Sequence, residues 1–302
     1  MAIRDPGYSP AVDGGGYLGS IGAGLGAALC LGVGDYLARH LTVAHGWRRA
    51  VWLVQLWSLV PVTIAALLVD GPPALSGRAL ALAVGLGVSY SIGIVALYRG
   101  LARGPISLVS PIASTFAVVT VGLSACFGRA PTPMVLVGLA VATAGVVVAA
   151  APRERGAETS QRPGSGVVWA LVSSLSFGAT FYAIAGGVAT LGVLWPLVGI
   201  RITCAGLLSA LVAGERRPLQ RPAGSVAVIA VAVAALDSGG VILYTIGTTL
   251  GHVAVVAVLS SLFAVVTVIL AQLRMRERLA AWQWVGVVLV LAGVAWTSAA
   301  GH

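Results

Sequence analysis

Long apolar stretches dominate this chain. Ten runs of about 20 residues are almost free of charge, and a helix of that length spans the roughly 30 Å hydrocarbon core of a bilayer. A β-barrel would instead alternate apolar and polar residues along strands of about ten residues. The predicted helical spans are Tyr17–Ala38, Ala50–Val69, Ala79–Tyr98, Gly104–Phe127, Pro133–Ala151, Gly166–Gly187, Val193–Ala213, Gly224–Gly247, Gly251–Leu273 and Ala280–Ala299.

The polar composition supports a membrane protein. Charged residues make up 9% of the 302, whereas an ordinary soluble domain has about 25%. That is too little polar surface to cover a soluble globule of this size, which excludes a soluble enzyme and a disordered or disulfide-rich secreted chain. Cys30, Cys126 and Cys204 each lie within an apolar run without CxxC spacing, as small buried side chains do. The first run has no usual cleavage site and is interpreted as a transmembrane helix.

The two halves of the chain resemble each other. The segment GPISLVSPIASTFAVVTV at 104–121 aligns with GHVAVVAVLSSLFAVVTV at 251–268, and TAGVVV at 143–148 aligns with LAGVAW at 291–296. Further pairs share an offset of 146 residues: Gly32 with Gly178, Tyr36 with Tyr182, and Gln55 with Arg201. A nearly constant offset over several helices indicates an internal repeat. The predicted parts are a polar tail (1–16), a first repeat (17–151), a charged linker (152–165) and a second repeat (166–299).

The number of spans in each repeat predicts how the repeats are arranged. A unit of five spans ends on the opposite side of the membrane from where it began, so the second copy is inverted. Inverted repeats are typical of secondary transporters, which bind their substrate between the repeats. The sequence therefore predicts an all-α polytopic membrane protein with ten transmembrane helices in two inverted five-helix repeats.

Arginine positions predict the orientation in the membrane. The chain has no lysine, and 14 of its 18 arginines lie in the regions that follow spans 1, 3, 5, 7 and 9. These are Arg39, Arg48, Arg49, Arg99, Arg103, Arg153, Arg155, Arg162, Arg216, Arg217, Arg221, Arg274, Arg276 and Arg278. Arg4, Arg78 and Arg129 lie on the other side. The positive-inside rule places the larger set in the cytoplasm and both termini outside the cytoplasmic membrane.

Two charged residues lie near the middle of predicted spans, where ionisable groups are costly and therefore functional candidates. Arg201 could hold a substrate carboxylate or neutralise Asp237, because its planar guanidinium suits carboxylates. Asp237 could bind a substrate amine or take up a proton. The alternative is a buried ion pair that locks the seventh and eighth spans together. The corresponding residues of the first repeat are neutral: Gln55 for Arg201, and Tyr90 or Ser91 for Asp237.

Other candidates have a structural alternative beside the functional one. Asp35 lies near the end of the first span, four residues before Arg39, and this spacing predicts an ion pair at the membrane interface. The functional alternative is that Asp35 lies in a cytoplasmic vestibule or gate. Gln55 could bind substrate or a neighbouring helix. Tyr90 is in mid-span, whereas Tyr98 and Tyr244 lie near helix ends, as aromatic-belt residues do. Pro111 interrupts the fourth span, and Ser260 lies at nearly the same depth in the ninth. The candidate substrate- or ion-binding residues are Arg201, Asp237, Gln55, Tyr90, Asp35, Tyr244, Pro111 and Ser260.

The sequence offers no catalytic or cofactor motif. No HExxH motif, paired carboxylates or Ser–His–Asp arrangement lies at membrane depth, and no nucleotide-binding loop is present. We therefore expect neither an enzyme nor a bound cofactor or metal. The net charge of +9 comes from short loops and forms no basic stripe for nucleic acid. The expected partners are the lipid bilayer, a small-molecule substrate and a proton as coupling ion.

Three segments carry a family resemblance: residues 253–294 with the Glu277-Arg278-Leu279 turn, ALYRGLARGPISLVSPIAST at 96–115 and GLAVATAGV at 138–146. In these segments the chain resembles the EamA family of the drug/metabolite transporter superfamily. The resemblance implies ten helices in two inverted repeats that move small organic molecules, often outward. We expect an alternating-access exporter of metabolites or drugs. A flippase for lipid-linked intermediates and a membrane scaffold or regulatory protein that transports nothing are the alternatives.

Overall fold

In the computed structural model, every regular element among the described residues is a helix. The structure describes residues 14–73, 76–127, 133–150, 163–213, 224–250, 262–275 and 280–300, with residues 256, 259 and 260. The elements are α1 (Gly14–His45), α2 (Trp47–Val69), α3 (Gly77–Arg103), α4 (Ile106–Ser114), α5 (Phe116–Phe127), α6 (Pro133–Ala150), α7 (Pro163–Leu191), α8 (Trp195–Ala213), α9 (Gly224–Thr249), α11 (Phe263–Leu270), the π-helix η1 (Ala271–Met275) and α12 (Ala281–Ala300).

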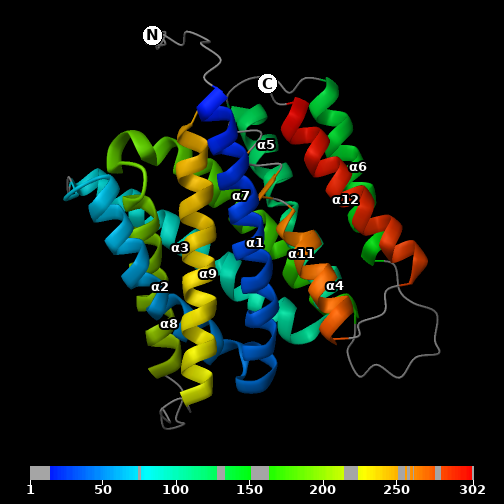
Figure 1. The fold of residues 1–302 in the computed structure, drawn as a ribbon, viewed down its shortest axis with the longest axis horizontal. Helices are drawn as coiled ribbons and strands as arrows, with labels where there is room; N and C mark the ends of the chain where they lie inside the picture. The colour runs from blue at the N-terminus through cyan, green and yellow to red at the C-terminus, as the bar shows by residue number, and fades with distance from the viewer. Residues whose placement is uncertain are drawn as a thin grey trace.

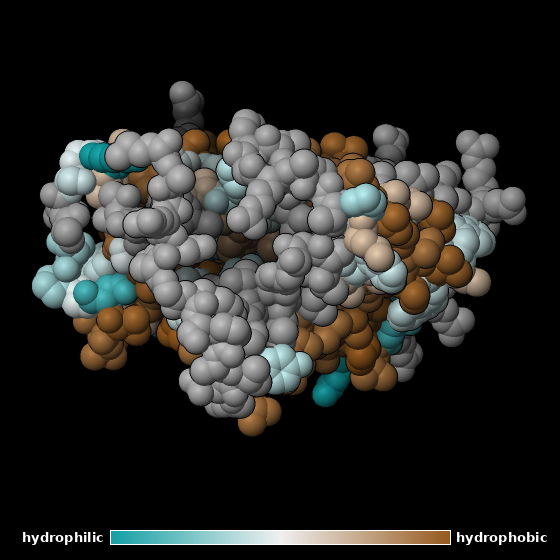
Figure 2. Space-filling model, turned by 90° about the horizontal axis from the view of Figure 1, so that it is seen from above, coloured by the Kyte–Doolittle hydropathy of each residue, from teal (hydrophilic) through white to brown (hydrophobic). Residues whose placement is uncertain are grey.

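Within the described residues, six helices are long and apolar enough to cross a membrane: α1, α2, α3, α7, α8 and α9. Apolar side chains also reach the surface around the end face shown in Figure 2. On α2, Leu56, Val60 and Ile64 are exposed at four-residue spacing, whereas Gln55 and Ser58 are buried. An apolar outside with polar groups inside is the arrangement a lipid environment favours.

The predicted spans and the observed helices differ at several boundaries. Helices α1 and α3 continue beyond the predicted ends, to His45 and Arg103. The fourth span consists of α4 and α5, which are divided at Thr115. Only part of the ninth span is described, as α11 and η1. The Glu277-Arg278 turn and most of the 152–165 linker lie outside the described residues, and the ten-helix count stays a prediction.

The division of the fourth span corrects the prediction for Pro111. Pro111 lies within α4, and the interruption comes at Thr115, whose N–H bonds to the Ile112 carbonyl three residues earlier (3.2 Å). The Leu262 N–H makes the corresponding bond to the Leu259 carbonyl (3.2 Å) in the second half, where no proline is near. Because the same turn forms without proline, Pro111 is not required for the break.

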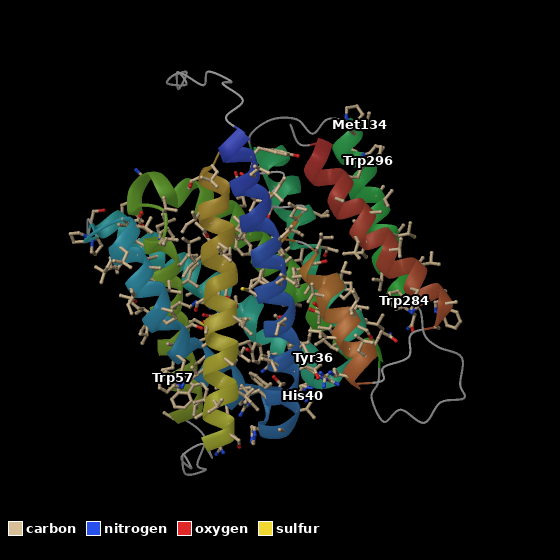
Figure 3. All side chains as sticks on the ribbon, viewed as in Figure 1. Tyr36, His40, Trp57, Met134, Trp284 and Trp296 are labelled. Carbon is tan, nitrogen blue, oxygen red and sulfur yellow. The ribbon has the colours of Figure 1, made fainter. Side chains whose placement is uncertain are left out.

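Four helix pairs run antiparallel: α1 with α9, α2 with α8, α3 with α7, and α6 with α12, the last pair lying at one flank (Figure 1). In each pair, residues near the start of one helix lie against the end of the other: Gly19 by Leu250, Trp52 by Ser209, Gly166 by Gly100, and Met134 by Trp296. Figure 3 shows Met134 and Trp296 together at one end of α6 and α12. Helices α1 and α7 also contact α11 and α5, respectively.

Glycines allow the closest of these approaches. A Cβ on Gly32 would lie 2.6 Å from Cβ of Val266, and a Cβ on Gly178 would likewise collide with Val119. Small residues at such crossings let helix backbones approach in a membrane, where packing drives association. These crossings bring the middles of the helices around a common centre.

Candidate functional site

A buried network of hydrogen bonds joins four helices at their middles. Arg201 of α8 is 2% exposed and donates from Nη1 to Gln55 Oε1 on α2 (2.7 Å) and to the Tyr90 hydroxyl on α3 (3.0 Å). Its Nη2 donates to Asp237 Oδ2 on α9 (2.5 Å), which forms an ion pair. The structure thus brings together the four predicted candidates that lie in mid-span.

Arg201 is well compensated in this position. Its guanidinium carbon also lies 5.1 Å from the centroid of the Tyr90 ring, within the range of a cation–π interaction. Charge-assisted hydrogen bonds offset the cost of removing the guanidinium from water. The Gln55 Oε1 atom accepts the hydrogen bond from Arg201, whereas the buried Nε2 atom of the same side chain has no hydrogen-bond partner in the described part of the chain.

A cavity of about 80 Å³ lies beside this network. Tyr90 and Asp237 belong to both, whereas the guanidinium of Arg201 lies behind them. Apolar residues make up most of the lining, and the polar residues are Asp35, Tyr90, Tyr98 and Asp237. A void of this size with carboxylates and hydroxyls in its wall can hold water or a small polar ligand.

Aromatic rings form one continuous part of the lining. Four of the five phenylalanines in the chain line the cavity, and they come from α5, α7 and α11. The ring centroids of Phe116 and Phe181 are 5.0 Å apart, those of Phe116 and Phe263 are 6.5 Å apart, and those of Tyr90 and Phe177 are 5.1 Å apart. Such distances are those of packed aromatic pairs.

Asp35 lies in the cavity wall and not near a helix end as predicted. Because α1 continues to His45, Asp35 falls well inside the helix, where its Oδ2 accepts a hydrogen bond from Ser110 Oγ (3.0 Å). The Nη1 atom of Arg39 donates a hydrogen bond to the Gly104 carbonyl, between α3 and α4 (2.9 Å). The geometry therefore corrects the predicted interfacial position of Asp35 and places this residue in the cavity wall, whereas its role as a gate stays a prediction.

The remaining candidates, Tyr244, Pro111 and Ser260, are not among the described residues that line the cavity. Tyr244 packs against Phe181 at 5.7 Å between ring centroids and is not among the lining residues. Pro111 and Ser260 are buried in the packing. Tyr98, predicted to be an aromatic-belt residue, is buried and lines the cavity because α3 extends to Arg103.

Chemically, this arrangement is suited to binding. In the described part of the chain, no group of three or more His, Cys, Asp or Glu side chains could hold a metal ion. The charged groups are one guanidinium and two carboxylates, and rings supply most of the remaining contact surface.

Comparisons with known proteins agree with this architecture. Residues 164–299 match the EamA-like transporter family. No curated protein sequence matches the chain significantly. Among the solved structures, one described only as the crystal structure of a protein is similar with a TM-score of 0.56 and 18% identity, over 89% of this chain and 95% of that one. That likeness concerns the fold alone. With its apolar helices long enough to cross a bilayer, the chain is a multi-pass membrane protein, and the match of residues 164–299 to the EamA-like transporter family places it in the drug/metabolite transporter superfamily.

Proposed function

We propose that this protein is a secondary transporter that moves small organic metabolites or drugs across the cytoplasmic membrane by alternating access. The observation that carries this proposal is the cavity between helices of the two halves, with Asp35 and Tyr90 from one half and Asp237 from the other in its wall. A scaffold without transport activity would be expected to have a filled, apolar centre.

The contacts between the halves support two inverted repeats. At the sequence offset of 146 to 148 residues, α2 corresponds to α8 and α6 to α12, and each of these pairs is antiparallel. The contact of α1 with α9 corresponds to that of α7 with α3. An axis that relates antiparallel helices to each other lies perpendicular to them, and for membrane-spanning helices that direction is in the membrane plane.

Equivalent hydrogen bonds support the same relation. Thr267 Oγ1 donates to the Gly32 carbonyl (3.2 Å), and Thr120 Oγ1 donates to the Gly178 carbonyl (3.1 Å). Thr267 is the repeat equivalent of Thr120, and Gly178 is the repeat equivalent of Gly32. Two repeats of this kind can exchange conformations, so that a central site opens first to one side of the membrane and then to the other.

The orientation, direction and coupling complete the proposal. Helix α1 begins and α12 ends at the same end of the bundle, whereas α3 ends and α7 begins at the other (Figure 1). This second end holds Arg48, Arg99 and Arg103, and we assign it to the cytoplasm. Export is proposed by analogy with the family, and proton coupling is proposed because Asp237 borders the cavity.

A screen for accumulation tests the transport function. A strain that lacks the gene and a strain that overexpresses it are exposed to a panel of drugs, and their intracellular metabolites are measured. Overexpression should lower the intracellular level of at least one compound. Equal levels of every compound in the two strains would count against an exporter.

Reconstituted protein tests the coupling. In proteoliposomes, the Asp237→Asn variant should lose substrate uptake driven by a pH gradient, because the carboxylate is replaced by a neutral amide. The variant should remain monodisperse on size-exclusion chromatography. Undiminished pH-driven uptake would refute the proton role of Asp237.

A further inference from the structure

The charges around the cavity do not cancel. The Arg201 guanidinium is paired with Asp237, so these two side chains together are neutral. Asp35 also lines the cavity, and its hydrogen-bond partner among the described residues is the uncharged hydroxyl of Ser110. With its acids ionised, the site therefore has one uncompensated negative charge, in a place where an unpaired charge is costly.

The two carboxylates and the aromatic rings come from different helices. A Cβ on Gly34 would lie 3.9 Å from the backbone nitrogen of Asp237, so Asp35 and Asp237 are at the same level of the α1–α9 contact. Phe116, Phe181 and Phe263 belong to α5, α7 and α11. A ligand in the cavity would contact both the carboxylates and the rings.

From this combination we infer that the cavity binds a monovalent organic cation with a flat apolar body, whose positive charge is balanced by Asp35. This inference rests on the proposed transport function and names its substrate class. Aromatic faces attract cations through the negative potential of the ring, and this attraction grows in a site shielded from water. An anionic substrate would be repelled by Asp35 while the only guanidinium of the network lies behind the wall.

Three related probes distinguish the possible ligand classes. N-methylquinolinium is a permanent cation, quinoline at mildly alkaline pH is neutral, and quinoline-2-carboxylate is an anion on the same ring system. Their binding to the full chain in lipid nanodiscs is measured by isothermal titration calorimetry. The wild type should bind the cation at least about tenfold more tightly than quinoline, which corresponds to about 1.4 kcal/mol.

Two variants assign the effect to residues. Asp35→Asn should abolish the preference for the cation and change quinoline binding by less than about twofold, because the amide keeps the shape without the charge. Phe181→Leu should weaken cation binding by about 2- to 30-fold, as expected for the loss of one cation–π contact. Asp70→Asn is the matched control, because Asp70 lies at the end of α2 and does not line the cavity; it should leave the preference unchanged.

The inference is overturned if Asp35→Asn, shown to be monodisperse, keeps the preference, or if the wild type binds quinoline-2-carboxylate more tightly than the cation. Uptake of the same probes into proteoliposomes separates this result from the transport proposal. Uptake of the anion without binding of the cation would refute the substrate class and leave the carrier intact. Binding of the cation that depends on Asp35, with no uptake of any probe, would support the site and count against transport.

Discussion

Replacing Arg201 by methionine tests how strongly the buried network holds the helices together. Methionine keeps much of the apolar stem but removes every donor, so Gln55 and Tyr90 each lose a hydrogen bond and Asp237 loses its cation. Removing one partner of a buried ion pair costs about 3–5 kcal/mol. Because Asp237 is 18% exposed, we expect the lower value, a decrease of about 3 kcal/mol in the free energy of unfolding.

A double-mutant cycle isolates the contribution of the pair. The free energy of unfolding is measured by SDS titration in mixed micelles for the wild type, Arg201→Met, Asp237→Asn and the double variant. Since the double variant leaves neither an unpaired guanidinium nor an unpaired carboxylate, we expect it to be about 1–2 kcal/mol more stable than the sum of the two single effects. Additive losses would show that the pair makes no net contribution, and the reasoning above would be wrong.

Three other perturbations address the helix contacts, each measured by the same SDS titration. Gly32→Ala and Gly178→Ala should each lower the free energy of unfolding by about 1–3 kcal/mol, because the added methyl group overpacks a helix crossing. Gly22→Ala is the control, because a Cβ at this position would have no neighbour within 4 Å, and it should cause no loss of stability. An equal loss for Gly22→Ala would contradict the explanation. Asp70→Ala should lower the free energy of unfolding by about 1–2 kcal/mol, because the Asp70 carboxylate accepts hydrogen bonds from the backbone N–H groups of Val193 (3.1 Å) and Leu194 (2.6 Å) just before α8. An unchanged free energy of unfolding would exclude this capping role. Arg99→Gln should lower the free energy of unfolding by about 1–2 kcal/mol, because the Arg99 guanidinium carbon lies 4.3 Å from the centroid of the Trp47 ring and 4.7 Å from that of the Trp169 ring. Arg99→Lys keeps the positive charge and should retain part of this stability. A larger loss for lysine than for glutamine would argue against a cation–π contact.

The sequence predicted the helical class and the positions of the long helices because membrane helices are defined by apolar length. It did not predict where they end. Helices α1 and α3 continue into polar residues, since a helix needs its backbone hydrogen bonds and not an apolar surface. Asp35 and Tyr98 were therefore assigned to the membrane interface, although both line the cavity.

The candidate site was only partly predictable. Arg201 and Asp237 could be found because a charged residue in an apolar run is conspicuous. Phe116, Phe177 and Phe181 could not, because a phenylalanine in a membrane helix looks the same in sequence whether it faces lipid or a cavity. In a chain with only five phenylalanines, a signal that could have revealed them was their recurrence near matching positions of the two halves, such as Phe116 with Phe263.

The departures from symmetry bear most directly on function. Under the proposed two-fold relation, Gln55 is the equivalent of Arg201, and Tyr90 is the equivalent of Asp237 at an offset of 147. Arg201 therefore donates hydrogen bonds to its own equivalent, Gln55, and to both Tyr90 and Asp237. Asp35 corresponds to Phe181 at an offset of 146. In the proposed mechanism, equivalent packing would let the repeats exchange conformations. Unlike side chains at equivalent positions would give the cavity a carboxylate for one part of a ligand and an aromatic ring for another. A ligand with a charged group and a flat apolar body matches that asymmetry.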